Sequence, residues 1–110
     1  MSYSEYLKHI LDEAEYLIGT SKGITKNVFL KDETVKRAFV RSIEIIGEAV
    51  KKLPEDFRDK HSALDWRAIA GTRDKLVHDY FGIDYEIVWD IVKNEIPNLK
   101  KYVKQILKGK

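Results

Sequence analysis

The chain has 110 residues, of which 44% are hydrophobic and 35% charged, and its formal net charge is only +2. This length and composition are typical of a single folded domain, here residues 1–110. The absence of cysteine excludes disulfide bonds, a thiol nucleophile and cysteine-ligated metals. No apolar run approaches the roughly 18 residues of a membrane-spanning helix, and the first eight residues carry no signal-peptide core. We therefore expect a cytoplasmic protein that has no membrane partner.

The positive charge is concentrated at the end of the chain. From Leu99 onward there are five lysines and no acidic residue: Lys100, Lys101, Lys104, Lys108 and Lys110. Lysines at the end of a helix complement its dipole, which favours a solvated helix end. The same lysines can also form a patch that attracts phosphate. The overall charge is lower than dedicated nucleic-acid binders usually carry, so both interpretations stay open.

Apolar residues recur with a helical period along almost the whole chain and predict four amphipathic helices. The first covers about residues 4–18 and ends at Gly19. The second covers about residues 32–53, with Asp32 as its N-cap and Pro54 as its stop. The segments 24–31 and 55–58 can each hold one further turn of helix.

The third helix is expected to begin at the N-cap Asp65 and to run to about Tyr80, with Gly82 as its C-terminal glycine. The fourth begins at the cap residue Asp84 and runs to about residue 107, and Pro97 inside it predicts a kink or a break. Four such helices with short connections predict an all-α fold, an antiparallel four-helix bundle.

Two features of these helices concern their packing. Trp66 and Trp89 are expected to anchor the core. Gly47 and Gly71 fall inside expected helices, where each glycine costs about 1 kcal/mol relative to alanine. Their presence indicates close contact between helices near the third helix.

Three isoleucines lie off the main apolar faces of the second and fourth helices, namely Ile45, Ile87 and Ile91. A monomeric bundle would expose them to water. Burial between two copies is the simplest alternative, because symmetric dimers are the commonest oligomers. We therefore expect a homodimer.

The third helix carries a polar cluster, consisting of Arg73, Asp74, His78 and Tyr80. At about 100° per residue, Asp74 and His78 are an i, i+4 pair, and His78 lies about 140° around the helix from Arg73. The bland interpretation is a solvated helix face with an Asp–His pair. The alternative is a site that holds a substrate between the arginine and the histidine.

The cluster suits RNA cleavage without a metal ion. The ribose 2′-OH attacks the adjacent phosphorus and expels the 5′-oxygen, and histidine can transfer the protons near neutral pH. Arg73 can hold two phosphate oxygens while negative charge develops. Asp74 can orient the imidazole of His78, and Tyr80 can donate to phosphate. One copy supplies one such histidine, so a two-fold pairing would complete the chemistry.

The other polar candidates are weaker. His9 and His61 are expected to be surface histidines, and no histidine pairs with carboxylates at a metal-ligand spacing, so no metal site and no cofactor are predicted. Glu44 and Glu48 are an i, i+4 pair on the second helix. They are either a solvated face or groove-lining residues near Arg73 of either subunit.

A series of motifs in chain order resembles one family along nearly the whole chain. The motifs are Phe29-x2-Asp32, then Ala38 and Ser42-Ile43-Glu44-Ile45-Ile46-Gly47-Glu48-Ala49, then Trp66-x2-Ile69-x-Gly71-x-Arg73-Asp74-x3-His78-x-Tyr80, and finally Val88-Trp89 and Ile96-Pro97-x-Leu99. The chain resembles the HEPN superfamily and, within it, the HepT-like (DUF86) group. The Arg-x4-His-x-Tyr string in this context is the specific part of the resemblance.

The resemblance implies a four-helix bundle that dimerises, or forms a higher oligomer, and joins two Arg-x4-His motifs in one groove. It implies a metal-independent ribonuclease toxin of a type VII-like toxin–antitoxin pair, with Arg73 and His78 as catalytic residues. Its partner would be a minimal nucleotidyltransferase antitoxin (MntA-like) that transfers AMP to Tyr80. Asp74 stands where the family often has asparagine, which puts a negative charge beside the phosphate site. The alternative is a non-catalytic docking or nucleotide-binding subunit of a nucleotidyltransferase complex.

Overall fold

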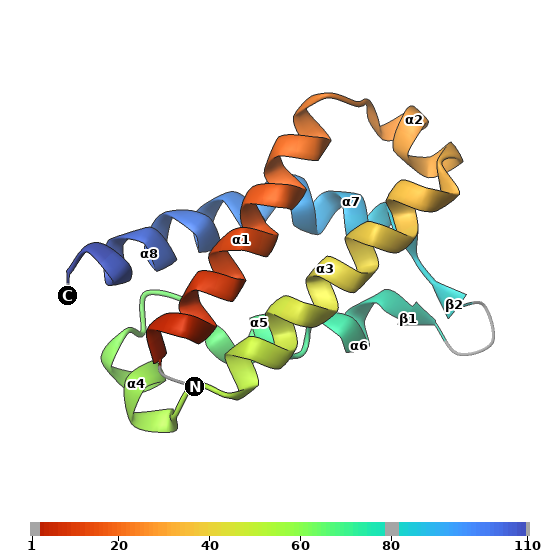
Figure 1. Cartoon of the computed structure of the whole chain (residues 1–110). Helices are drawn as coiled ribbons and strands as arrows, with labels where there is room; N and C mark the ends of the chain where they lie inside the picture. Colours follow the sequence, from red (N-terminus) through yellow and green to blue (C-terminus); the bar gives the residue numbers. More distant parts are fainter. Residues whose placement is uncertain (1–2, 79–81, 110) are drawn as a thin grey trace.

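The computed structural model describes residues 3–78 and 82–109, with the backbone alone for Arg73, Val77 and His78 (Figure 1). The described residues form eight helices and one pair of two-residue strands, which confirms an all-α fold. In chain order these are α1 (Tyr3–Lys22), α2 (Lys26–Lys31), α3 (Glu33–Lys51), α4 (Glu55–Lys60), α5 (Trp66–Ala70), α6 (Thr72–Leu76), β1 (Val77–His78), β2 (Gly82–Ile83), α7 (Tyr85–Asn94) and α8 (Ile96–Lys108).

The core lies between the long helices of the bundle. α1 and α3 run side by side in opposite directions, and α8 packs against α1 (Figure 1). α5 and α6 lie against α3, and α7 contacts α1, α3 and α8. The most deeply buried side chains come from all of these layers: Leu7, Ile10, Leu17, Phe39, Val50, Leu76, Val88, Val92 and Val103. In the described part of the chain, no helix has the length and apolar character needed to cross a membrane.

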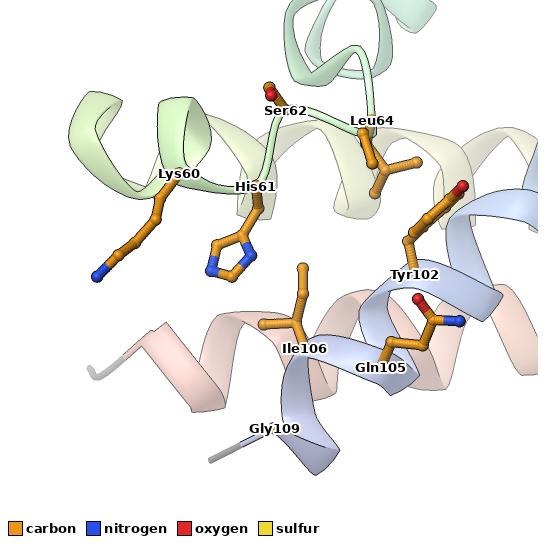
Figure 2. Close-up of a pocket in the computed structure, with 9 residues that line it drawn as sticks. Lys60, His61, Ser62, Leu64, Tyr102, Gln105, Ile106 and Gly109 are labelled. Carbon is orange, nitrogen blue, oxygen red and sulfur yellow. The ribbon is translucent and has the colours of Figure 1, made fainter.

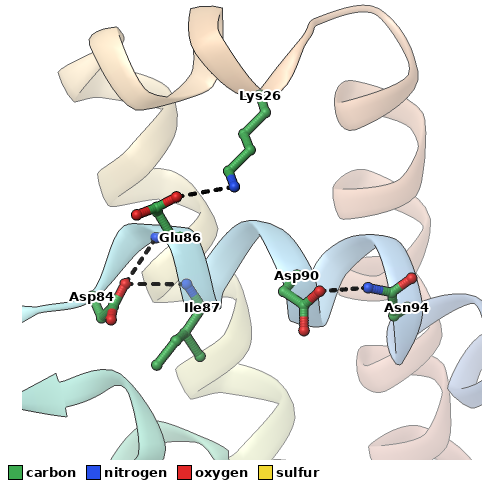
Figure 3. A network of polar contacts seen from close by, with 6 residues as sticks. All are labelled: Lys26, Asp84, Glu86, Ile87, Asp90 and Asn94. Atoms are coloured by element: carbon green, nitrogen blue, oxygen red, sulfur yellow. Dashed lines mark hydrogen bonds and ion pairs between the residues drawn. The ribbon is translucent and has the colours of Figure 1, made fainter.

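Three aspartates begin helices, as the sequence predicts. The side-chain Oδ1 atoms of Asp32, Asp65 and Asp84 each accept a hydrogen bond from the backbone N–H three residues later, at 3.1, 3.0 and 3.2 Å respectively. Asp84 also accepts from the N–H of Glu86 at 3.0 Å (Figure 3). Each bond satisfies a backbone donor that the first turn of a helix otherwise leaves unpaired.

The first two expected helices differ from the structure mainly at their ends. α1 continues through Gly19 to Lys22, so the prediction that Gly19 ends it is wrong. Its last turn is held by the buried Ser21, whose Oγ donates to the carbonyl of Ile18 at 3.1 Å. The two optional turns are the short helices α2 and α4, which cover the bundle ends before and after α3.

The third expected helix is wrong beyond Leu76. The chain turns at Gly71 between α5 and α6, and α6 gives way to β1, which pairs antiparallel with β2. The register places Val77 opposite Ile83 and His78 opposite Gly82. Gly82 has a φ of 75°, a left-handed conformation that favours glycine, and it lies in a strand instead of ending a helix.

The fourth expected helix breaks where its proline predicts. α7 ends at Asn94, and α8 begins at Ile96 with Pro97 in its first turn. A proline has no N–H to donate, and its ring fits best in the first turn of a helix. The break lets α7 lie against α2 and α3 while α8 follows α1.

Close packing explains one of the two glycines in question. A Cβ atom at Gly47 would lie 3.3 Å from the carbonyl oxygen of Ala70, so the missing side chain lets α3 approach the end of α5. Gly71 caps α5, and a Cβ there would meet only the carbonyls of its own preceding turn. The helix-contact interpretation is therefore confirmed for Gly47 and wrong for Gly71.

The two tryptophans lie in or against the core, but two of the three isoleucines expected to be exposed also pack against it. Trp66 is 4% exposed and is a core anchor, as predicted. Trp89 is half-buried and packs against the core. Ile91 is 3% exposed, so the prediction that a monomer would expose it is wrong, and Ile87 also packs against the core. Ile45 remains partly exposed on α3.

Candidate functional site

The short helix α6 has one buried and one exposed side. Thr72 and Leu76, four residues apart, are 7% and 1% exposed and face the core. The hydroxyl of Thr72 donates to the carbonyl of Ala68 at 3.1 Å, which ties α6 to α5 across Gly71. Asp74 and Lys75 are exposed. The helix therefore presents Asp74 and Lys75 to solvent on a fixed base.

The predicted polar cluster is divided between two elements. Arg73 and Asp74 belong to α6, whereas His78 is the second residue of β1. The predicted helical i, i+4 pair of Asp74 and His78 is therefore wrong, because the helix ends between them. Tyr80, the fourth member, lies outside the described residues.

A backbone hydrogen bond anchors the strand pair to the bundle. The N–H of Asp84 donates to the carbonyl of Leu76 at 2.8 Å, while its carboxylate caps α7. Leu76 is itself buried against the core. One residue thus joins the end of α6, the end of β2 and the start of α7. This junction sets the backbone position of His78 relative to Arg73.

The two glutamates of the second predicted helix lie beside this region. Glu44, Gly47, Glu48, Lys51 and Ala70 line a shallow hollow of about 340 Å³ between α3 and the end of α5. Ala70 precedes Arg73 by three residues. The Oε1 atom of Glu48 lies 3.7 Å from Nη1 of Arg41, and both side chains are exposed. The structure therefore places both glutamates on one face of α3, next to the segment that leads into α6.

The remaining histidines have different surroundings. His9 is exposed on α1, as predicted. His61 caps the C-terminus of α4 and is half-buried, with its ring centroid 4.6 Å from that of Phe57. It lines a hollow of about 570 Å³ together with residues of α8, shown in Figure 2. Across the described ranges, no group of three or more His, Cys, Asp or Glu side chains could hold a metal ion.

Two features here escape sequence reasoning. The role of Thr72 depends on the turn at Gly71, which the helical period does not reveal. The hollow beside His61 joins segments about 40 residues apart in the chain. Its signal in the sequence is weak: Tyr102, Gln105, Ile106 and Gly109 fall on one face of a helix whose other face is the apolar one.

Comparison with known proteins assigns the family. The model of the family described as "Ribonuclease HepT-like" matches residues 6–106. A protein of Caldanaerobacter subterraneus named "Putative RNase TTE0752" is 59% identical over 102 residues, which cover 93% of this chain and 91% of that protein. The protein of Thermococcus cleftensis named "Probable ribonuclease HepT" is 41% identical over 99 residues, 90% of each chain. No solved structure matches the chain.

The fold and the site define a class of protein, namely all-helical bundles that carry an Arg-x4-His motif, here Arg73-x4-His78. The family match spans nearly the whole chain, and the relatives cover about nine tenths of it. The chain belongs to the ribonuclease HepT-like family of the HEPN superfamily.

Proposed function

We propose that this protein is a metal-independent endoribonuclease and the toxin of a type VII-like toxin–antitoxin pair. The observation that carries the proposal is the match of residues 6–106 to the HepT-like family, with the Arg73-x4-His78 motif inside it. The relatives whose names specify RNase or ribonuclease support RNA as the substrate class. The exposed charged side of α6 offers that substrate an open approach.

In the proposed reaction the 2′-oxygen of a ribose bonds to the adjacent phosphorus, and the bond from phosphorus to the 5′-oxygen breaks. The 2′-OH proton passes to a base and the leaving oxygen receives a proton from an acid, which gives a 2′,3′-cyclic phosphate and a 5′-OH. His78 transfers these protons, because imidazole titrates near neutral pH. Arg73 binds the phosphate oxygens, whose negative charge increases in the transition state.

Asp74 has a modified role in this proposal. Because α6 ends at Leu76, Asp74 cannot orient His78 as a neighbour on the same helix face. Its carboxylate must instead reach the imidazole across the junction of α6 and β1. An exposed carboxylate beside a phosphate site also lowers the affinity for RNA, so Asp74 both orients the base and moderates binding.

Two copies of the chain complete the proposed site. Each copy brings one motif histidine, whereas the reaction needs a base and an acid. A symmetric dimer places two arginines and two histidines in one groove. Ile45 is partly exposed on α3 and supplies apolar surface for such an interface. Glu44 and Glu48 then line the groove, and further pairing of dimers gives a higher oligomer.

The experiment that tests the proposal is cleavage of RNA by the purified protein in EDTA. The wild type is expected to cleave, and His78→Ala to cleave about 10²–10⁴-fold more slowly, the range that general acid–base catalysis supplies. A His9→Ala protein is the matched control, because it removes an exposed histidine on α1. Equal cleavage by the wild type and His78→Ala would show that His78 is not the proton-transferring group.

Tyr80 is the proposed control point. A minimal nucleotidyltransferase would transfer AMP from ATP to the hydroxyl oxygen of Tyr80, which loses its proton as pyrophosphate leaves. The product carries added bulk and negative charge two residues after His78, which repels RNA. After co-expression with such an enzyme, the mass of the wild type is expected to rise by one or more AMP groups, and RNA cleavage to fall with it. Tyr80→Phe is expected to keep the unmodified mass. A Tyr80→Phe protein that is still modified would place the acceptor elsewhere, with Tyr85 as the first residue to check.

One observation favours a second candidate function. The exposed carboxylate of Asp74 follows Arg73 directly, and it disfavours phosphate binding. A chain that has lost activity would serve as a non-catalytic docking or nucleotide-binding subunit of a nucleotidyltransferase complex. Its signature is co-purification with the nucleotidyltransferase without RNA cleavage by the free protein, in EDTA or with added Mg²⁺. Asp74→Asn, which restores the common family residue, would then fail to raise cleavage.

A further inference from the structure

A second hollow lies at the end of the bundle away from β1 and β2. It is formed by the segment after α4 and by the last turns of α8, and its volume is about 570 Å³ (Figures 1 and 2). We call it the α4–α8 hollow. Its lining residues are Lys60, His61, Ser62, Ala63, Leu64, Tyr102, Gln105, Ile106 and Gly109. A volume of this order is typical of pockets for small ligands.

The side of the hollow formed by α4 is held by buried aromatic residues. The indole Nε1 of Trp66 donates to the backbone carbonyl of His61 at 2.9 Å. The ring of His61 lies 4.6 Å from the ring of Phe57, and Phe57 and Trp66 are 6% and 4% exposed. The imidazole therefore sits on a fixed base and faces Ile106 across the hollow (Figure 2). Lys60 lies at the rim beside it.

The side formed by α8 has an aromatic ring in its lining and two lysines just outside it. At about 100° per residue, the lining residues of α8 cover an arc of roughly 100°, and Lys101 and Lys108 lie about 40° and 60° beyond Gln105. Both lysines are exposed. The Nζ atom of Lys101 is 5.8 Å from the centroid of the Tyr102 ring. A cation and a partly exposed aromatic ring are thus close enough to contact one nucleotide.

The charge of this hollow distinguishes it from its neighbour. Among the described residues, its charged and titratable lining groups are Lys60, His61 and the phenol of Tyr102, and none of them is a carboxylate. The neighbouring hollow, of about 610 Å³, is lined by Glu55, Asp59 and Asp65 as well as by two arginines. Phosphate is repelled by carboxylates, so the two hollows are not equivalent for a nucleic acid.

We infer that the α4–α8 hollow binds one nucleotide of single-stranded substrate RNA, at a distance from the site of cleavage. The base packs on Tyr102 and Ile106 and bonds to the amide of Gln105. The flanking phosphates lie against Lys60, His61, Lys101 and Lys108. Aromatic rings beside cations are the usual way in which proteins hold single strands without reading their sequence. The inference rests on the proposed function, because it assigns the path of the same substrate.

The separation of the two sites has a consequence for the substrate. Figure 1 places the C-terminus of α8 and α4 at one end of the molecule and β1 and β2 at the other, and the longest extent of the chain is 41 Å. A strand that contacts both sites must therefore cross the bundle. The hollow is expected to raise the affinity for long single strands and to act on KM instead of kcat.

The test is the binding of a single-stranded RNA of about 30 nucleotides, longer than common site sizes for single strands, measured by fluorescence anisotropy at several salt concentrations. The His78→Ala background keeps the RNA intact. Adding Lys101→Gln and Lys108→Gln is expected to raise Kd about tenfold and to reduce the slope of log Kd against log salt by about 1.4, or about 0.7 for each lysine. The matched control is Lys22→Gln with Lys31→Gln, two exposed lysines at the ends of α1 and α2.

The ring is tested separately from the charge. Tyr102→Phe keeps an aromatic face and is expected to bind as the parent does, whereas Tyr102→Leu is expected to raise Kd about tenfold. In the active protein both the lysine pair and Tyr102→Leu are expected to raise KM for the long RNA, with the change confined to KM. Thermal unfolding of each variant separates these losses from a folding defect, because only Tyr102→Leu alters core packing.

Each other result overturns the inference in a distinct way. If the wild type cleaves RNA and the lysine pair binds as tightly as the control pair, the proposed function stands and the hollow is not part of the RNA path. If the wild type neither binds nor cleaves RNA, both proposals fall together. If the variants change the mass of the protein in solution instead of its RNA affinity, this face is a contact with another protein chain.

Discussion

Replacing Arg73 by alanine is expected to lower the rate of RNA cleavage by about 10²–10³-fold, the loss that follows removal of one preorganised donor to a developing negative charge. In the proposed reaction the guanidinium donates two parallel hydrogen bonds to phosphate, a geometry that an ammonium group does not offer. Lys75, the next cation in α6, is exposed and two residues further along the chain. Arg73→Lys should therefore recover only a small part of the rate, because ammonium cannot form the bidentate contact.

The matched control is Lys75→Ala, which removes one positive charge from the same short helix and should change the rate less than about threefold, the scale of one screened surface charge. Single-turnover cleavage at saturating RNA measures the chemical step in all three variants. Circular dichroism and thermal unfolding show whether α6 still forms. A rate for Arg73→Ala that matches that of Lys75→Ala would mean that Arg73 only attracts RNA and does not stabilise the transition state.

Much of the fold was predictable because its signals are local. Asp32, Asp65 and Asp84 were predicted as N-caps from their positions alone, and each carboxylate accepts the expected backbone bond. Capping is decided by a side chain and an N–H three residues apart, so a short window of sequence contains both partners. Pro97 ended a helix for the same kind of reason, since its missing N–H and its ring act within one turn.

The end of the third helix could not be predicted in this way. The helical period extends past Leu76 in the sequence, but the chain instead pairs His78 with Gly82 and binds the N–H of Asp84 to the carbonyl of Leu76. The bond between Asp84 and Leu76 joins residues eight positions apart, whereas an α-helix joins residues four positions apart. A glycine at the end of a helical pattern predicts a C-cap, but left-handed glycines also occur at bulges and turns beside strands, and Gly82 is the first residue of β2.

This difference changes the candidate site more than the fold. The motif residues Arg73 and His78 were found by sequence and spacing, whereas their mutual geometry was calculated for one continuous helix. With His78 in β1, the histidine is positioned by the backbone pairing and the Asp84 junction. A motif predicts which residues form a site, but tertiary hydrogen bonds decide how they are placed relative to one another.

The misjudged isoleucine shows the same limit in the core. Ile91 lies off the main apolar face of its helix when that helix is drawn alone, yet it is 3% exposed. α7 is covered on several sides, because it contacts α1, α2, α3, α6 and α8. A helix surrounded in this way needs apolar residues around most of its circumference. Apolar residues off the main face of a short helix are therefore weak evidence for a dimer interface.

Phe29→Ala is expected to cause the largest loss of stability, about 3–5 kcal/mol in the free energy of unfolding. The side chain is fully buried, with its ring centroid 5.0 Å from that of Phe39 and 5.2 Å from that of Trp89. It is the buried residue of α2 and joins this helix to α3 and α7. An exposed ion pair of 3.0 Å between Lys26 and Glu86 also links α2 to α7 (Figure 3). Exposed ion pairs of this kind add little to the free energy of unfolding.

Chemical denaturation measures the loss, with Val28→Ala as the matched control, because Val28 is the neighbouring residue and is 50% exposed. The control should change the free energy of unfolding by less than about 0.5 kcal/mol. Where Phe29→Ala is too unstable to purify, Phe29→Leu keeps most of the volume and should lose less. A loss below about 1 kcal/mol for Phe29→Ala would show that α2 is not part of the cooperative core.

The same substitution also tests how the bundle supports the site. The N-cap of α7 is Asp84, whose N–H donates to the carbonyl of Leu76 at the end of α6. Loosening α7 should therefore free the junction that positions the backbone of His78. RNA cleavage by Phe29→Ala is therefore expected to match the wild type at low temperature and to fail well below the temperature at which the wild type fails. Cleavage that follows the folded fraction alone would mean that the junction is rigid without α2. Cleavage that is lost before unfolding would show that Phe29 stabilises the site through α7.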